Sequence, residues 1–305
     1  MSISPGIGHE PVPGHRLSQL LGKGGLGEVW QADVADGTTV ALKFIATKEN
    51  LLGVKEIRAI QAIRKLPHQN LVQIKSIWSP PGYLVISMEL AEGSLLELLE
   101  LHQQELGTAI QPVEVCFYLS QMADALDFLN GRQHWIDGSR AGIQHCDVKP
   151  SNMLLFGDTI KLSDFGLATL TYSRVQAHQR VGTPDYVAPE IFLGQVSDQS
   201  DQYSLAISYY ALRCGRLPFP EADAFDASWL RKKPPPDLSL LTAAEQPIIA
   251  RALQPTPQDR WASCQELLAQ LTAVFQPPAP AASEAESVLP KKQNGGLGPA
   301  SAKVS

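Results

Sequence analysis

Cysteine is scarce in this sequence, and long apolar runs are missing from it. The 305 residues include four cysteines, which lie far apart and form no CxxC pair: Cys116, Cys146, Cys214 and Cys264. This pattern gives no support to a zinc site or a dithiol redox motif, and it indicates free thiols in a reducing compartment. No stretch approaches the roughly 20 apolar residues of a membrane span, and residues 1–15 lack the apolar core of a secretory signal. We therefore expect a soluble, cytoplasmic protein without a membrane span.

An excess of basic residues is also missing. Lysine and arginine number 25 against 31 aspartates and glutamates, which gives a formal net charge of −6. A nucleic-acid-binding protein usually needs a basic surface that neutralises phosphates, so we expect no nucleic-acid partner. Hydrophobic residues make up 44% of the chain, which is enough for a large core. The length corresponds to roughly two domains or one large two-lobed unit.

The two ends of the chain differ from its middle in composition. Residues 1–15 are rich in glycine and proline, and we expect them to be flexible. Residues 277–305 lack apolar periodicity, which predicts a disordered tail. One continuous globular block, residues 16–276, remains between these ends.

The block begins with strand patterns and continues with helical ones. Strands are predicted over residues 16–22 and 28–34, on either side of a Gly-rich turn. One helix follows, with Ile57, Ile60 and Ile63 on one face, and two further strands come after it. Helical spacing dominates the rest of the block. This order predicts an α+β, two-lobed fold: a small antiparallel β-sheet lobe with one helix, then a larger, mainly helical lobe. A ligand is expected in the cleft between the lobes.

The first motif is the Gly-rich segment Gly22-Lys23-Gly24-Gly25-Leu26-Gly27. A GxGxxG pattern alone also fits an ordinary hairpin turn. A dinucleotide-binding loop would require a helix directly after the glycines, and a Walker-type loop would require Ser or Thr after the lysine. Here a strand pattern follows instead. A strand, Gly-rich loop and strand can fold over the phosphates of ATP, because glycines let backbone N–H groups approach closely.

The second motif is a lysine on a predicted strand, in Val40-Ala41-Leu42-Lys43. Alternation along a strand places Ala41 and Lys43 on one face, where a purine can pack on the alanine and the lysine can reach phosphate oxygens. A single strand lysine is more often a solvated surface residue. Glu56 is the only carboxylate between Glu49 and Glu89, and we expect it to pair with Lys43, because a lysine in a cleft needs a partner.

The third motif combines the segment His145-Cys-Asp-Val-Lys-Pro-Ser-Asn152 with Asp164-Phe-Gly166. Phosphoryl transfer from ATP needs a carboxylate that orients the acceptor hydroxyl, oxygen ligands for Mg²⁺, and positive charge near the transferred group. This segment supplies all three in a fixed order, as Asp147, Lys149, Asn152 and Asp164. Each of them alone would be interpreted as a turn or cap residue.

With these motifs in place, residues 16–276 resemble a eukaryotic-type Ser/Thr protein kinase catalytic domain. The resemblance implies an N-lobe over residues 16–88, a hinge over 89–91 and a C-lobe over 92–276. The form of the segments HCDVKPSN and MELAEGSL resembles bacterial members of the family. The implied reaction is transfer of the γ-phosphoryl group of ATP to a Ser or Thr hydroxyl of a protein substrate, in a signalling role.

The resemblance also implies a role for individual residues. Asp147 is expected to act as catalytic base, Lys149 to contact the γ-phosphate, and Lys43, paired with Glu56, to bind the α- and β-phosphates. Mg²⁺, with Mn²⁺ as the alternative ion, is expected on Asn152 and Asp164. The nucleotide is expected to contact Leu21, Gly22, Gly24, Gly27, Val29, Ala41, Lys43, Met88, Glu89, Ala91 and Leu154.

Three further matches are expected to be structural or to concern the substrate. The segment 182–190, GTPDYVAPE, resembles the substrate-docking segment of the family. Asp201 resembles an aspartate that supports the catalytic loop, and Arg260 resembles the arginine that pairs with Glu190. The Asp-x-Lys-Pro form of the catalytic loop, together with Thr183, favours Ser and Thr over Tyr as acceptor.

The sequence departs from the family at the residue before the catalytic aspartate, where Cys146 replaces the usual arginine. In the family that arginine binds a phosphorylated activation-loop residue, and Gln179 occupies the usual phosphorylation position here. We hypothesise that the activation loop is organised without phosphorylation. Residues 131–142, before the catalytic loop, have the composition of an inserted, solvated loop.

Three other functions are compatible with parts of this pattern. An ATP-binding pseudokinase scaffold usually lacks the strand lysine, the base or the metal-binding aspartate, and all three are present here. An adaptor acting through the C-terminal tail would need an amphipathic pattern or a dense run of charge in residues 277–305, and this sequence has neither. A small-molecule kinase is disfavoured by the segment 182–190. The sequence does not indicate the oligomeric state.

Overall fold

The computed structural model describes residues 5–24, 27–46, 54–136, 138–172, 175–177, 182–219 and 234–276, with the backbone alone for 54–56 and 175–177. The chain forms one compact unit through Phe275. The expected tail, residues 277–305, lies outside the described residues.

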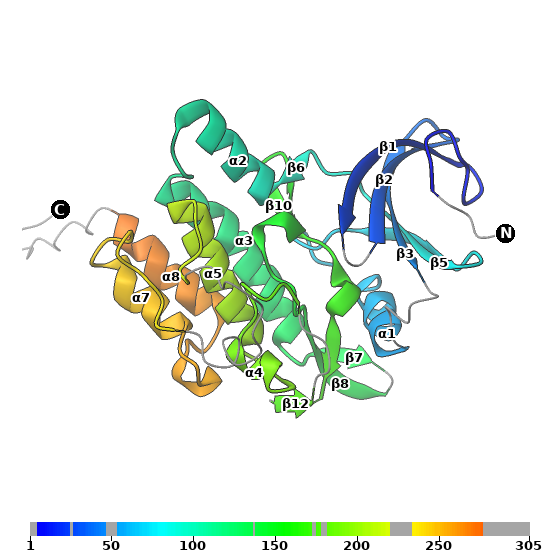
Figure 1. Cartoon of the computed structure of the whole chain (residues 1–305). Coiled ribbons are helices and arrows are strands. Elements are labelled where there is room, and N and C mark those ends of the chain that lie inside the picture. Colours follow the sequence, from blue (N-terminus) through cyan, green and yellow to red (C-terminus); the bar gives the residue numbers. More distant parts are fainter. Residues whose placement is uncertain are drawn as a thin grey trace, which may run out of the picture. The chain divides into compact units, whose positions relative to one another are not determined.

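The N-lobe is built on a five-stranded antiparallel sheet in the order β1-β2-β3-β5-β4 (Figure 1). Its strands are β1 (His15–Gly24), β2 (Gly27–Val34), β3 (Thr39–Ala46), β4 (Ile74–Trp78) and β5 (Tyr83–Met88). The middle strand β3 is buried from its second to its seventh residue, and Lys43 is the only polar residue in this buried part. Both faces of the sheet are therefore covered, and a lysine on β3 must find its partners inside the protein.

The segment before β1 packs onto the N-lobe. The Gly8 N–H donates to the Leu17 carbonyl at 2.7 Å, and the Leu17 N–H donates to the His9 carbonyl at 2.9 Å. Val12 is buried and joins the cluster on one face of the sheet. We expected residues 1–15 to be flexible, but their described part pairs with β1. The Val12 side chain holds it there by completing the apolar cluster on this face of the sheet.

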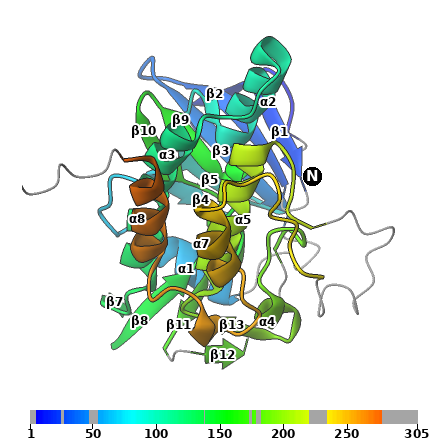
Figure 2. The same ribbon diagram turned by 90° about the vertical axis from the view of Figure 1, so that its left-hand side faces the viewer.

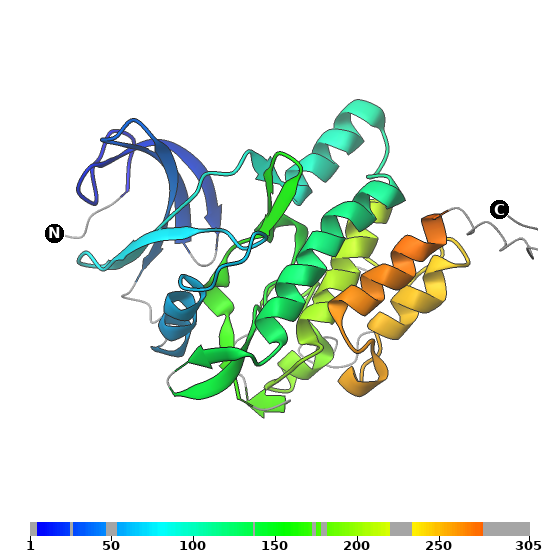
Figure 3. The same cartoon turned by 180° about the vertical axis from the view of Figure 1, so that it is seen from behind.

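Helix α1 (Val54–Ile63) packs beside the sheet through Ile60 and Ile63, which are both buried. The predicted Ile57, Ile60 and Ile63 face accounts for this contact, with Ile57 partly buried at its margin. In Figures 1 and 3 the helix lies between the five-stranded sheet and the hairpin that precedes the catalytic loop.

The C-lobe is mainly helical, as expected (Figures 2 and 3). Its helices are α2 (Leu95–Leu106), α3 (Pro112–Asn130), α4 (Pro189–Phe192), α5 (Ser200–Cys214), α7 (Glu245–Ala252) and α8 (Cys264–Phe275). Helix α5 is buried from Ser200 to Leu212 and forms the centre of the lobe. Helix α8 packs on α3, where the Asp127 carboxylate accepts hydrogen bonds from the N–H groups of Cys264 and Gln265 at 2.8 and 2.9 Å.

Short strands and 3-10 turns place the catalytic segments between these helices. One small sheet contains β6 (Gly93–Ser94), β9 (Met153–Phe156) and β10 (Thr159–Leu162), with the 3-10 turn η1 (Pro150–Asn152) just before β9. A second 3-10 turn, η2 (Phe165–Leu167), follows β10, and a third, η3 (Pro257–Asp259), precedes α8.

The segment 131–142 was expected to be a solvated loop, and the structure corrects this. It forms most of a hairpin of β7 (His134–Ile136) and β8 (Ser139–Gln144), and β11 (Thr169–Thr171) pairs with β8 from the other side. Ala141 and Ile143 are fully buried. Their alternation with Arg140 and Gly142 is a strand signal that the polar composition obscured.

Two more strands and the thiols complete the description. Strand β12 (Val175–Ala177) pairs with β13 (Gln195–Ser197) in a two-stranded antiparallel sheet. All four cysteines are free thiols: Cys116, Cys146 and Cys264 are buried, and Cys214 is half-buried. Burial raises the pKa of Cys116 and of Cys214 to about 11, and it raises the pKa of Cys146 and Cys264 well above the usual value.

Candidate active site

A cavity of about 430 Å³ lies between the N-lobe sheet and the first elements of the C-lobe. It reaches from β1, β2 and β3 across the chain after β5 to the catalytic segments. Eleven of the predicted residues line it: Leu21, Gly22, Val29, Ala41, Lys43, Met88, Glu89, Ala91, Asn152, Leu154 and Asp164. The apolar members enclose a space of the size and character of a nucleotide-base site.

A second cavity of about 630 Å³ continues the first one toward the catalytic loop. The two share Gly22, Val29, Lys43, Asn152 and Asp164, so they form one continuous cleft. The second cavity adds the other predicted residues Gly24, Gly27, Asp147 and Lys149. Every predicted site residue whose side chain the structure describes therefore borders this cleft.

The end of β1 and the start of β2 form the roof of the cleft. Gly22 lies opposite Val29, and Gly24 lies opposite Gly27. Gly27 has φ of +132°, and a Cβ at this position would lie 1.8 Å from the Phe44 carbonyl oxygen on β3. Only glycine fits there, because both the backbone angle and the close approach exclude a side chain. A Cβ at Gly22 or Gly24 would meet open space.

Lys43 is 6% exposed on β3, and its ammonium group forms an ion pair with the Asp164 carboxylate. Asp164 adopts the left-handed conformation with φ of 62° and directly precedes the 3-10 turn η2. Glu56, the partner predicted for Lys43, lies in α1, and its side chain is outside the described part of the structure. The predicted Lys43–Glu56 pair therefore remains a prediction.

Asp147 is 5% exposed and has hydrogen bonds on both carboxylate oxygens. Its Oδ1 accepts from the Thr183 N–H at 2.9 Å and from the Thr183 hydroxyl at 2.8 Å. Its Oδ2 accepts from the Asn152 amide at 3.0 Å and lies 3.0 Å from the Lys149 ammonium. Burial alone would raise the pKa of Asp147, but the Lys149 charge and the Thr183 hydrogen bonds outweigh burial and lower it.

Thr183 belongs to the segment that was expected to dock the substrate, and it is part of the Asp147 cluster. The Lys149 ammonium donates to its hydroxyl, which in turn donates to Asp147. Gly182 allows this contact, because a Cβ there would lie 2.3 Å from the Cys146 carbonyl oxygen. A three-residue cluster of carboxylate, ammonium and hydroxyl thus ties the segment 145–152 to the segment 182–190.

Asn152 and Asp164 offer the kind of oxygen atoms that bind Mg²⁺. Asn152 donates through its amide nitrogen to the Asp147 main-chain carbonyl at 2.8 Å and to its carboxylate, which leaves the amide oxygen as its ligating atom. The described residues contain no group of three or more His, Cys, Asp or Glu side chains placed to hold a metal. These donors fit an ion that takes one or two protein ligands and completes its shell with phosphate and water, as Mg²⁺ does beside ATP.

Asp201 supports the catalytic loop from α5. Its fully buried carboxylate accepts from the N–H groups of His145 and Cys146 at 2.8 and 2.9 Å, and burial raises its pKa. Cys146 needs this support, because its φ of +64° is unusual for a residue with a side chain. The His145 ring contacts the Ser163 carbonyl at 2.8 Å and packs edge-on against Phe165.

Glu190 and Arg260 form a buried, two-pronged ion pair at 2.8 Å for each hydrogen bond. Burial would raise the pKa of Glu190, but the Arg260 guanidinium outweighs it and lowers the pKa. The Ser200 hydroxyl also donates to Glu190 at 2.8 Å. This pair joins the end of the segment 182–190 to the last part of the C-lobe.

Several residues at the cleft have no signal of their own in the sequence. Val72, Ser151 and Ser163 line the first cavity: Ser151 lies in η1, Val72 precedes β4, and Ser163 directly follows β10. Lys161 on β10 binds the Glu89 carboxylate at 2.8 Å, and the same carboxylate accepts from the Gln73 N–H at 2.7 Å. The Glu89 side chain thus links β10 to the chain before β4.

Comparison with known proteins places this cleft in a family. Residues 15–272 match the model of the protein kinase domain. The chain belongs to the protein kinase family. The eukaryotic-type Ser/Thr kinase resemblance and the two-lobed α+β fold expected from the sequence are confirmed.

Curated relatives of this kinase domain include bacterial and plant proteins. It is 34% identical over 266 residues to serine/threonine-protein kinase Pkn1 of Myxococcus xanthus, which covers 81% of this chain and 36% of the relative. It is 32% identical over 269 residues to CBL-interacting protein kinase 4 of Oryza sativa, covering 82% of this chain and 56% of the relative. A third is pkn3 of Myxococcus xanthus, 30% identical over 286 residues, covering 85% of this chain and 50% of the relative. The matched region thus spans about a third to just over half of these relatives. Within the described residues of the kinase domain, no helix has the length and apolar character to cross a bilayer.

Proposed function

We propose that this kinase domain transfers the γ-phosphoryl group of ATP to Ser or Thr hydroxyls of a protein substrate. One observation carries the proposal: Asp147, Lys149, Asn152, Asp164 and Lys43 all border one continuous cleft whose other end is apolar. Phosphoryl transfer depends mainly on positioning and on charge around the transferred group, and this arrangement supplies both. The names of the relatives given above agree with this activity.

In this proposal the apolar end of the cleft binds adenine. Leu21, Val29, Ala41, Met88 and Leu154 would cover the two faces and the inner edge of the base, and backbone groups of Glu89 and Ala91 would meet its polar edge. The glycines of the β1–β2 turn would cover the phosphates. Lys43 would bind the α- and β-phosphates and, in exchange, release Asp164.

Asp147 would orient the substrate hydroxyl and accept its proton. Its lowered pKa keeps it ionised at neutral pH, as an acceptor must be. Lys149, 3.0 Å from Asp147, would steady the γ-phosphate. Mg²⁺ on Asn152 and Asp164 would neutralise charge on the phosphates. The Thr183 hydroxyl now donates to the oxygen of Asp147 that the substrate would use, so substrate binding would displace this contact.

The activation segment, which runs from Asp164-Phe-Gly166 to the end of the segment 182–190, would be organised without phosphorylation. Position 146 carries a buried thiol instead of a guanidinium, and its main-chain N–H is bound by Asp201. The described parts of the segment are instead held by pairing of β11 with β8 and of β12 with β13. Gln179, which occupies the position usually phosphorylated in the family, lies outside the described residues.

The test is transfer of label from γ-labelled ATP with Mg²⁺, with and without a generic basic protein as substrate. Asp164→Ala is run alongside. Label on Ser or Thr with the wild type, and its loss with the variant, are expected. Binding of Mg²⁺-ATP without any transfer would favour the pseudokinase alternative. A sample treated with a protein phosphatase and shown by mass spectrometry to lack phosphate should keep its rate, if the activation segment needs none.

A further inference from the structure

The activation segment is held by two separate sheets. Its first part, β11, pairs with β8, with Thr171 opposite Gly142. A later part, β12, pairs with β13, with Val175 opposite Ser197. Figure 1 shows β12 at the lower edge of the C-lobe near the β7–β8 hairpin. The activation segment can keep a single backbone conformation only if the two sheets stay fixed relative to each other.

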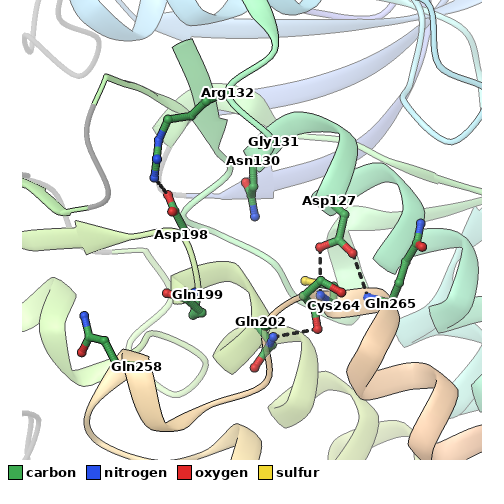
Figure 4. Close-up of a pocket in the computed structure, with 12 residues that line it drawn as sticks. Asp127, Asn130, Gly131, Arg132, Asp198, Gln199, Gln202, Gln258, Cys264 and Gln265 are labelled. Carbon is green, nitrogen blue, oxygen red and sulfur yellow. Dashed lines mark hydrogen bonds and ion pairs between the residues drawn. The ribbon is translucent and has the colours of Figure 1, made fainter. Parts of the chain in front are cut away.

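An ion pair joins the two sheets. Arg132 lies between the end of α3 and the start of β7, so it stands at the base of the β7–β8 hairpin. Asp198 directly follows β13 and precedes α5. The Arg132 guanidinium donates to the Asp198 carboxylate, as Figure 4 shows.

The backbone at Arg132 adopts an energetically unfavourable conformation in forming this contact. Arg132 has φ of +45°, a left-handed conformation that is unfavourable for a residue with a side chain and that persists only where the surroundings require it. Gly142 makes room for the arginine stem: a Cβ there would lie 3.0 Å from the Arg132 Cγ atom and 2.8 Å from the Asn130 carbonyl. Gly142, which makes room for Arg132, also pairs with Thr171 of β11.

The other carboxylate near Arg132 already has hydrogen-bond partners, so Asp198 is the carboxylate that pairs with Arg132. The pair borders a cavity of about 670 Å³, and the other carboxylate that lines this cavity is Asp127. Both Asp127 oxygens are engaged by N–H groups at the start of α8. The Arg132 and Asp198 side chains are 25% and 26% exposed, so salt screens the pair only in part.

We propose that the Arg132–Asp198 ion pair is a permanent anchor of the activation segment, with both residues acting as positioning residues for phosphoryl transfer. The proposal rests on the proposed kinase function and supplies its regulation. In a kinase regulated by phosphorylation, an added phosphate on the activation segment binds an arginine. Here the Asp198 carboxylate, which is always present, binds Arg132 beside the activation segment. The arginine comes from the end of α3 instead of position 146.

The test compares Asp198→Asn and Arg132→Asn with the wild type. Asparagine tolerates the left-handed conformation, so Arg132→Asn removes the charge without adding backbone strain. Asp237→Asn is the matched control, because it breaks the Arg216–Asp237 ion pair at 2.7 Å, whose side chains are 50% and 47% exposed in the same lobe. Amide hydrogen exchange is followed at residues 175–177 and 195–197, together with the rate of transfer to a peptide and the KM for ATP.

Both anchor variants should exchange the β12 and β13 amides about three- to tenfold faster, as expected for loss of a partly buried ion pair. The transfer rate should fall by a similar factor at an unchanged KM for ATP, and Arg132→Lys should recover part of it. Asp237→Asn should change none of these. Wild-type exchange at β12 and β13 in Asp198→Asn would overturn the anchor. Amide hydrogen exchange can be measured without catalysis. If the wild type transfers no phosphate, the proposed kinase function is refuted, but the exchange rates still test the Arg132–Asp198 anchor.

Discussion

At the scale of single residues, Asp147 is bound by three neighbours that all stabilise its ionised form. Two hydrogen bonds come from Thr183, one comes from Asn152, and the Lys149 ammonium lies 3.0 Å away. A buried carboxylate without them would be protonated more easily. The catalytic role proposed for Asp147 depends on these neighbours as much as on the aspartate.

Asp147→Asn should abolish most of the transfer while leaving nucleotide binding intact. Asparagine keeps the size of the side chain but cannot accept the substrate proton, and general base catalysis contributes about 100- to 10,000-fold. Initial rates with a peptide substrate, together with the dissociation constant of Mg²⁺-ATP, measure the two effects separately. A loss smaller than tenfold would argue against Asp147 as the base.

The pH dependence of the rate should respond to Lys149. Asp147 has a pKa below its ordinary value of 3.8, so it stays ionised, and the rate should not fall by its protonation until the pH is below that value. Lys149→Met removes the charge that opposes burial, so the pKa of Asp147 should rise and the acidic limb of the rate profile should move to higher pH. Rate profiles of both proteins within the pH range where they stay folded check this. An unmoved acidic limb would contradict the assignment.

At the scale of secondary-structure elements, the β1–β2 turn depends on one of its glycines for stability. In Gly27→Ala the new Cβ would collide with the Phe44 carbonyl oxygen, and its φ of +132° is unfavourable for alanine. We expect a loss of about 1–3 kcal/mol in the free energy of unfolding, measured by urea denaturation. Gly24→Ala is the control, since its Cβ meets open space. Equal stability of the two variants would contradict the structure of this turn.

The Glu190–Arg260 pair should make the C-lobe sensitive to the loss of one partner. Glu190→Gln leaves a buried guanidinium without its counter-charge, which costs about 3–5 kcal/mol in the free energy of unfolding. The pKa of Glu190 is lowered in the folded state, so its contribution is fully present above its usual value of 4.5 and disappears as the pH falls through the folded value. Urea unfolding at pH 7 and pH 4 should show a smaller difference between wild type and variant at pH 4. A variant as stable as the wild type at pH 7 would refute this role.

The elements that could be predicted are those with a clear period or a motif of fixed spacing. The strands around the Gly-rich turn, α1 and the long C-lobe helices follow their apolar patterns. The β7–β8 hairpin was missed, because Gly, Arg and Asp make up half of residues 131–142 and the fully buried Ala141 and Ile143 give only a short apolar alternation. The site residues came from motif spacing. Contacts such as Lys161–Glu89 and Arg132–Asp198 join residues 72 and 66 positions apart, and no local pattern carries them.

At the scale of the whole molecule, backbone pairing joins the two lobes next to the cleft. The Val72 N–H donates to the Leu162 carbonyl at 2.9 Å, and the Leu162 N–H donates to the Asn70 carbonyl at 2.9 Å. The Asn70 amide also donates to the Ile160 carbonyl at 2.8 Å. A ligand in the cleft contacts both lobes and should therefore stabilise the domain as one unit.

A non-hydrolysable ATP analogue with Mg²⁺ should raise the melting temperature of the domain. A ligand that binds only the folded state stabilises it by about 2.7 kcal/mol at 100 times its dissociation constant. Thermal unfolding with and without Mg²⁺ measures the effect, and Asp164→Ala should lose the part that depends on the ion. A melting temperature that does not change at saturating analogue would contradict a nucleotide site in this cleft.

Because its native thiols are buried or half-buried, the domain is suited to labelling with a fluorescent probe at a single introduced cysteine. The pKa of every native cysteine is raised by burial, so thiolate, the species that reacts with maleimides, is rare at pH 7. Trp135, at the β7–β8 hairpin, is 74% exposed. A cysteine introduced there should react far faster than the native four. It would carry a fluorescent reporter close to the activation segment without removal of any natural cysteine.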